Sequence, residues 1–331
     1  MGQRKHGCRV AIERLARAVS PGAGAAVMAG GVVSLCFSAT GSSWLSWPLF
    51  AAAAMVWVVL VAVFVTRLLT DSGRWRSEAA LPSALTLVAG TAVLGTRLAE
   101  AGRPGLAQGL LVVGVALWVI LLPQVLAHWS TPTLGTSFLV CVAPQALAVL
   151  AARLARGAGQ RWEMYAAAAA FVLGLMLYGV VVCRFDFRQV VLGEGDQWVL
   201  GGALAISTLA GSVLLDASAR LGVLEGTRAA LHALASWLGW AAVAAYLPLA
   251  AAEVIRPRLR FDIRRWATVF PLGMAALASL QMSRVFHQNA LWDLGRALSW
   301  LALAAWLVVA AGSLRRARDI AARPADRCAQ R

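Results

Sequence analysis

Ten long apolar stretches follow one another along the chain, separated by short polar connections. They lie at roughly 22–39, 44–68, 80–97, 105–127, 133–152, 164–183, 197–215, 229–252, 266–283 and 290–312. Each is close to the length of about 20 residues that a helix needs to cross a bilayer. The connections hold turn-forming runs such as Gly102-Arg103-Pro104-Gly105 and are too short for a soluble domain. The pattern predicts an all-α integral membrane protein of about ten transmembrane helices, paired as five helical hairpins.

Successive stretches differ in character. The first, third, fifth and seventh are rich in small and weakly polar residues, whereas the second, fourth and tenth carry bulky ones such as Trp57, Trp118 and Trp306. Small residues let helices pack closely inside a bundle, and bulky apolar residues suit lipid. The alternation recurs with the period of a helical hairpin. It predicts five inner helices in a ring around a central pore, although each single stripe of small residues has a packing seam as its alternative.

The candidate pore lining consists of glycines and small polar side chains on these inner helices. It comprises Gly30, Ser34, Thr86, Gly90, Ser137, Cys141, Ser207, Thr208 and Gly211. Such a wall offers backbone dipoles and weakly polar groups without a full charge, so that an ion can enter and still leave.

Composition excludes a set of ordinary soluble domains, because 60% of the residues are hydrophobic, 14% are charged and the mean hydropathy is +0.72. The net charge of +15 does not indicate a nucleic-acid partner, since the basic residues sit in short clusters between apolar stretches. With the N-terminus inside, 21 of the 30 Lys and Arg residues fall on the cytoplasmic side. This bias predicts two cytoplasmic termini. The expected organisation is a basic segment 1–20, a transmembrane domain 21–314 and a basic tail 315–331.

Several kinds of chemistry lack their usual sequence signals. The helix centres hold no Asp, Glu, Lys or Arg, which argues against a proton or sodium motor driven by carboxylates. The four histidines do not pair at helical spacing, and no C-x-x-C, nucleotide-binding or hydrolase motif occurs. We therefore expect no enzyme activity, no metal and no cofactor.

The ninth stretch carries the most specific signal. Pro271 lacks a backbone N–H and predicts a bend or a break in the helix, and Gly273 loosens the same turn. Phe270 precedes this bend, where its ring is placed to plug the channel; simple packing between helices is the alternative. Arg264 and Arg265 come just before the helix and are predicted to raise the anion concentration at the inner mouth.

This stretch, FDIRRWATVFPLGMAALASLQMSRV, resembles the ninth helix of the tellurite-resistance/dicarboxylate transporter family, which includes slow-type anion channels of plant guard cells. PGAGAAVMAGGVVSL resembles the first helix of that family, QWVLGGALAISTLAG the seventh and GTSFLVCVAPQALAVLAA the fifth. The resemblance covers about residues 20–315. It implies a homotrimer in a bacterial plasma membrane, each protomer with its own pore closed by Phe270. Arg265 departs from the family, which often has an aromatic residue there.

Taken together, these features predict a channel or exporter for small anions such as chloride, nitrate, sulfite, dicarboxylate or tellurite, embedded in membrane lipid. Three alternatives remain open: a proton-coupled dicarboxylate or tellurite transporter of the same family, a non-transporting membrane subunit of a redox complex, and a membrane-embedded enzyme. The sequence identifies neither the physiological anion nor the opening signal.

Overall fold

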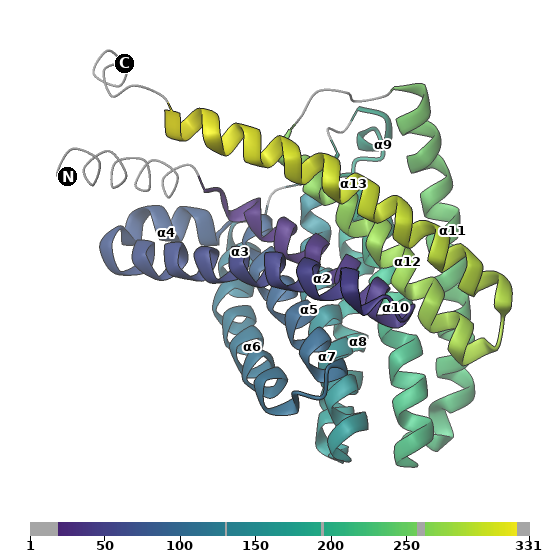
Figure 1. The fold of residues 1–331 in the computed structure, drawn as a ribbon. Helices are drawn as coiled ribbons and strands as arrows, with labels where there is room; N and C mark the ends of the chain where they lie inside the picture. Colours follow the sequence, from purple (N-terminus) through teal and green to yellow (C-terminus); the bar gives the residue numbers. More distant parts are fainter. Residues whose placement is uncertain (1–18, 130, 193–194, 257–261, 323–331) are drawn as a thin grey trace.

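The computed structural model describes residues 19–129, 131–192, 195–256 and 262–322, and these ranges are almost entirely helical and contain no strand (Figure 1). The α-helices are α2 (Gly24–Ala39), α3 (Ser43–Thr70), α4 (Ser72–Ala79), α5 (Thr86–Glu100), α6 (Pro104–Ala127), α7 (Leu139–Ala158), α8 (Arg161–Val182), α9 (Gln189–Leu192), α10 (Trp198–Leu221), α11 (Arg228–Ile255), α12 (Trp266–Phe286) and α13 (Asn289–Ala322). Short 3₁₀ turns lead into several of them. The predicted all-α membrane fold is confirmed.

Nine of the predicted spans each correspond to one long helix, whereas the third corresponds to a shorter helix that follows a sharp bend. Within the described residues nine helices are long and apolar enough to span a membrane by themselves. The third span is α5, which follows the 3₁₀ turn Pro82–Leu85 and is bent by 87° away from α4. Leu81 is extended, as expected for a residue before proline, so the helix cannot run straight through this point.

The two chain ends lie partly outside the described residues. The predicted basic segment is described only from Val19 onward, and the tail only to Ala322. In the tail, α13 continues past the expected end of the transmembrane domain at residue 314.

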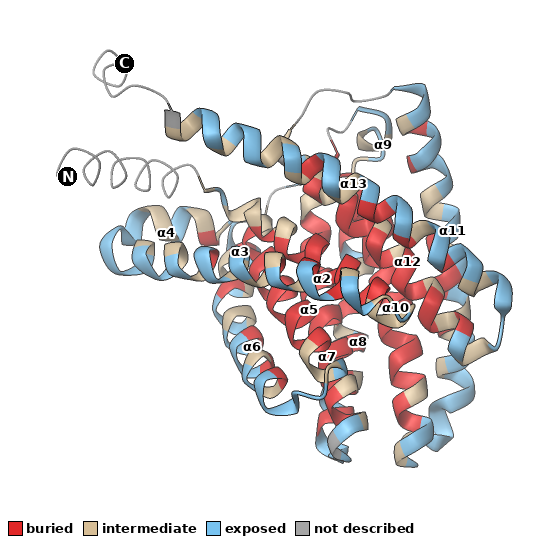
Figure 2. Cartoon of the chain, viewed as in Figure 1, coloured by how far each residue is buried: buried red, intermediate tan, exposed pale blue. Residues whose placement is uncertain are grey.

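Helices alternate between buried and exposed along the chain, as the residue pattern predicts. In the spans of α2, α7, α10 and α12, between 61% and 100% of the most apolar window is buried. In α3, α6, α8, α11 and α13 the share is between 17% and 28%. Every residue of α5 from Thr86 to Arg97 is also buried. Figure 2 shows this division as red inner helices and largely blue outer helices.

The five buried helices form a closed ring. α2 packs on α5, α5 on α7, α7 on α10, α10 on α12, and α12 returns to α2. Each is paired with the outer helix that follows it in the sequence, which makes five hairpins. Four outer helices (α3, α6, α8 and α13) also contact the neighbouring inner helix, so they cover the seams of the ring.

All five inner helices run in the same direction, because one outer helix separates each from the next. Their first residues meet at one end of the ring, where Thr86 lies against Gly24 and the backbone of Asp196 lies against Gly135. Their last residues meet at the opposite end, where Arg284 donates to the carbonyl of Ala39 at 2.6 Å. We call these the amino end and the carboxyl end of the ring.

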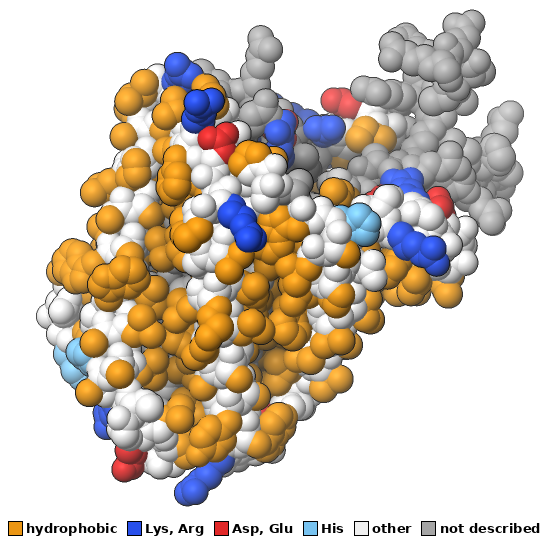
Figure 3. Space-filling view, turned by 180° about the vertical axis from the view of Figure 1, so that it is seen from behind, with side chains coloured by type: hydrophobic (Ala, Val, Ile, Leu, Met, Phe, Trp, Pro, Cys, Tyr) orange, Lys and Arg blue, Asp and Glu red, His pale blue; other side chains and the backbone are white. Residues whose placement is uncertain are grey.

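The outer helices present an apolar surface. Their exposed large side chains include Trp240, Leu247, Val254, Ile255 and Val308. Figure 3 shows hydrophobic side chains over most of the face in view, with Lys and Arg mainly toward its margins. A surface this apolar is unstable in water and suits the hydrocarbon core of a bilayer.

Polar side chains inside the bundle hold neighbouring helices together. Ser34 of α2 and Ser46 of α3 each donate a hydroxyl to the other's carbonyl, at 2.8 and 2.9 Å. Arg97 of α5 donates its Nε–H to the Ser46 hydroxyl at 2.9 Å and stacks over Trp47. These bonds satisfy polar groups that would otherwise be costly to bury.

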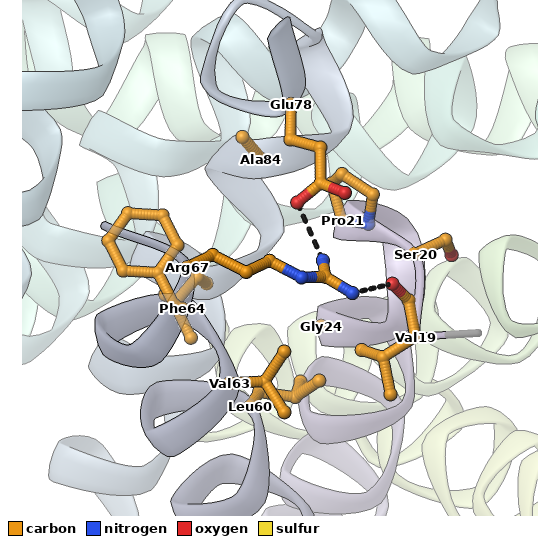
Figure 4. Close-up of a pocket in the computed structure, with 11 residues that line it drawn as sticks. Val19, Ser20, Pro21, Gly24, Leu60, Val63, Phe64, Arg67, Glu78 and Ala84 are labelled. Carbon is orange, nitrogen blue, oxygen red and sulfur yellow. Dashed lines mark hydrogen bonds and ion pairs between the residues drawn. The ribbon is translucent and has the colours of Figure 1, made fainter. Parts of the chain in front are cut away.

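A second anchor lies at the amino end, between α3 and the short helix α4. Arg67 reaches Glu78 at 2.6 Å and the carbonyl of Val19 at 2.8 Å, as Figure 4 shows. Its side chain lies among Phe64, Leu60 and Gly24 in a small apolar pocket. Arg67 thus joins α4 to α3 through the ion pair, and it joins α3 to the residues before α2 through the Val19 carbonyl.

Close packing at the amino end generates a test of stability. A Cβ atom on Gly135 would meet the backbone of Asp196 and Gln197, which cannot move aside easily. Gly135→Ala should lower the unfolding temperature in detergent by roughly 3–10 °C, because overpacking costs about 1–3 kcal/mol. Gly109→Ala on α6 is the control, since its Cβ would meet nothing within 4 Å. Equal unfolding temperatures for the two variants would contradict this packing.

Candidate functional site

Two close contacts show which sides of α12 face its neighbours in the ring. A Cβ atom on Gly202 of α10 would lie 2.9 Å from the Pro271 ring, and one on Gly273 would lie 3.0 Å from Val32 of α2. Glycine at these positions lets the helix backbones approach closely. Pro271 therefore marks the side of α12 toward α10, and Gly273 marks the side toward α2.

Phe270 lies on the side of α12 that faces the ring interior. Because successive helical residues turn by about 100°, it falls between the directions of Pro271 and Gly273. Leu272 and Ser279 point the opposite way, into a lateral groove that α10, α11 and α13 also line and that includes Thr208, one of the predicted pore-lining residues. The Phe270 side chain is 1% exposed. The ring of this phenylalanine is thus enclosed among the inner helices rather than turned to lipid.

The amino half of α12 is attached to three other helices. The Tyr246 hydroxyl of α11 donates to the carbonyl of Pro271 at 2.6 Å. Trp266 donates its indole N–H to Ser313 of α13 at 3.0 Å, and the Cys36 thiol of α2 approaches the Gly273 carbonyl at 3.4 Å. α12 continues without interruption through Pro271, so of the predicted bend or break the break is wrong. The bend stays a prediction.

The predicted lining residues all lie on inner helices or the turns that lead into them, and all are buried. Four of them bond to a carbonyl one turn earlier in their own segment: Thr86, Cys141, Ser207 and Thr208. Ser137 accepts from the Leu134 amide within the turn before α7. The Thr86, Ser207 and Thr208 hydroxyls donate to these carbonyls, so they keep lone pairs but have no donor to spare for an anion.

The remaining four predicted lining residues face neighbouring helices. Gly90 lies against Val27 of α2. Gly30 faces α3 and α13, and Gly211 faces α8 and α11. Ser34 is bonded to α3. Their contacts serve close packing, and a pore-lining role for any of these nine residues stays a prediction.

Arg264 and Arg265 lie at the amino end of the ring, where the sequence placed them. Arg265 forms an ion pair of 2.8 Å with Glu253 at the end of α11, and its side chain is 13% exposed. Arg264 pairs with Asp262 at 3.2 Å and is more exposed. Part of the positive charge of this pair is therefore offset locally, which weakens its pull on a distant anion.

The carboxyl end holds a chain of polar contacts that joins the ends of the inner helices. Arg156 of α7 pairs with Asp216 of α10 at 2.8 Å. Arg153 of α7 lies 3.6 Å from Glu100 of α5 and donates to Gln281 of α12 at 2.9 Å. These contacts connect helices that no covalent segment joins directly at this end.

Comparison with known proteins decides which family this ring represents. A family model described as voltage-dependent anion channel matches residues 18–314, which is nearly the whole chain. The chain belongs to this family. The family expected from the residue motifs is thereby confirmed.

Two relatives match a shorter part of the chain. Both are uncharacterized membrane proteins of Mycobacterium tuberculosis, one from strain CDC 1551 / Oshkosh and one from strain ATCC 25618 / H37Rv. Each is 30% identical to the chain over 122 residues, which cover 34% of this chain and 58% of the relative. The chain therefore spans less than two thirds of the length of these relatives.

Sequence reasoning missed Arg153 in this member of the anion-channel family. It placed the end of the fifth span at residue 152 and assigned Arg153 to the connection. The signal was available, because no helix-breaking residue lies between the expected end at residue 152 and Gly157. α7 consequently continues to Ala158 and carries Arg153 within the spanning helix.

The Tyr246 contact predicts a measurable effect on the mobility of α12 in this family member. Tyr246→Phe removes the hydrogen bond to the Pro271 carbonyl, a contribution of about 1 kcal/mol. Amide exchange in the Trp266–Met274 segment should become roughly fivefold faster in hydrogen-exchange mass spectrometry. Tyr165→Phe is the control, because Tyr165 is exposed on α8. Unchanged exchange in Tyr246→Phe would show that this bond does not hold the segment.

Proposed function

We propose that the five-helix ring conducts small anions along its axis and that Phe270 closes the path near the amino end. The observation that carries this proposal is the closed ring of five inner helices, with Phe270 on the interior side of α12. Membership of the anion-channel family supports the anion as the permeant species. The lateral groove between α10, α11, α12 and α13 lies on the opposite side of α12 from Phe270, so it is not part of this proposed path.

The direction of the inner helices favours anions over cations at the amino end. A helix N-terminus carries a partial positive charge of about half a unit, and five such termini meet there. Anions are attracted to this potential while cations are repelled. The carboxyl end has the opposite dipole sign, which Arg153 and Arg284 offset. We infer that the amino end faces the cytoplasm, because the Arg-rich connections lie at that end.

Phe270 acts as the gate in this proposal. Its buried ring occupies the interior between α2 and α10, and an anion cannot pass until the ring moves. Opening requires only a side-chain rotation together with a shift of the α12 amino half, a transition that a few kcal/mol can drive. The homotrimer implied by the resemblance, and the identity of the anion, remain predictions.

Truncation of the gate is the direct test. Phe270→Ala should raise chloride current in planar bilayers or oocytes at least tenfold above that of the unmodified protein, because it removes the plug without adding charge. Phe171→Ala is a matched control, since Phe171 is equally buried but lies on α8 against Gly211. Equal currents from Phe270→Ala and the unmodified protein at equal surface expression would remove Phe270 from the gate.

A second test separates passive conduction from proton coupling. The inner helices hold no acidic residue in their central turns, so the proposal predicts flux that follows the anion gradient alone. In liposomes, chloride or nitrate efflux through Phe270→Ala should persist when a protonophore abolishes the pH gradient. Efflux that stops with the protonophore would favour the proton-coupled transporter instead.

A further inference from the structure

Arg153 extends through the interior of the ring at the carboxyl end. It belongs to α7, whose neighbours in the ring are α5 and α10, yet it donates to Gln281 of α12 at 2.9 Å. Because α7 and α12 are not neighbours, a bond between their side chains must cross the space that the ring encloses. Glu100 of α5 lies 3.6 Å from the same guanidinium.

This bond lies in line with Phe270 along α12. Gln281 comes eleven residues after Phe270, which is about three turns, so both side chains project from the same side of the helix. The separation along the helix axis is about 16 Å. The ring is therefore crossed at two levels, once by an aromatic side chain near the amino end and once by Arg153 and Gln281 near the carboxyl end.

The guanidinium of Arg153 is buried and incompletely paired. Its side chain is 10% exposed, and Gln281 is 4% exposed. The Nε–H is enclosed and has no hydrogen-bond partner. An enclosed N–H without an acceptor is unfavourable, and a group of this kind in a native structure calls for a ligand or a function.

The surrounding charges leave Arg153 available to an anion. Its nearest carboxylate, on Glu100, lies beyond hydrogen-bonding distance at 3.6 Å, whereas Arg156 is paired with Asp216 at 2.8 Å. Arg97, the other deeply buried arginine of an inner helix, is held away from the interior by Ser46 and Trp47 on α3.

We propose that Arg153 forms an anion-binding site at the carboxyl end of the ring, where a small monovalent anion accepts a hydrogen bond from the free Nε–H and competes with Glu100 for the guanidinium. The proposal rests on the proposed function and adds the residue that selects the permeant ion. An anion that reaches this level meets a full positive charge in a dehydrated setting. The Glu100 carboxylate keeps the site from trapping the ion, because it attracts the Arg153 guanidinium and so favours release of the bound anion.

The test measures how chloride current saturates, with Phe270→Ala present in every variant so that conduction is not limited by the gate. Arg153→Gln should raise the half-saturating chloride concentration about tenfold, as expected for loss of one charge-assisted hydrogen bond. Arg153→Lys keeps the charge and should restore part of the affinity. Glu100→Gln removes the competing carboxylate and should lower the half-saturating concentration.

Arg156→Gln is the matched control, because it removes the same charge at the same end of the ring from a residue paired with Asp216. It should change the half-saturating concentration less than twofold. Equal shifts in Arg156→Gln and Arg153→Gln would overturn the proposal, since they would reflect general surface charge. Absence of any shift in Arg153→Gln would overturn it as well.

A binding measurement keeps this inference separate from the proposed function. If none of the variants conducts, the conduction proposal fails, and chloride binding is then followed by ³⁵Cl NMR line broadening on the detergent-purified protein. Broadening that disappears in Arg153→Gln but persists in Arg156→Gln would support the site without conduction. Identical broadening in the two variants, with matching size-exclusion profiles, would reject it.

Discussion

Close approach of five parallel helices encloses the axis of this protein and sets the position of every outer helix. Inside a bilayer every backbone polar group must be satisfied within the protein, so a solute can pass only between helices. The ring closes because small residues pack against bulkier ones where the helices meet. Gly90 packs against Val27, and Gly202 packs against Pro271. Larger side chains at these glycines would push the helices apart, and the enclosed axis would open to lipid.

The common direction of the inner helices has an electrostatic consequence at each end of the ring. Five N-termini give the amino end a positive potential without any fixed ion, and the five C-termini give the carboxyl end a negative one. Arg153 and Arg284 lie at that end, while Arg264 and Arg265 at the amino end are paired with carboxylates.

Hydropathy and residue size predicted the ten spans, their pairing into hairpins and the alternation of inner with outer helices, because lipid contact dictates these features directly. They did not predict the 87° bend before α5, since Pro82 lies inside an apolar stretch whose composition suggests one helix. Hydropathy and residue size also did not predict the direction in which individual side chains point. Gly30 and Gly211 were expected at the pore, yet their open sides face outer helices, and Arg153 was assigned to a connection although it lies inside the ring.

In the proposed function the ring interior, and not the lateral groove, carries the anion. The most direct measurement compares Leu277→Cys, on the interior side of α12, with Leu272→Cys in the groove. Both are made in protein that carries Phe270→Ala and whose own cysteines are replaced by alanine. A water-borne sulfonated thiol reagent should block the current of Leu277→Cys and leave that of Leu272→Cys unchanged. Block of Leu272→Cys with an unreactive Leu277→Cys would contradict the account.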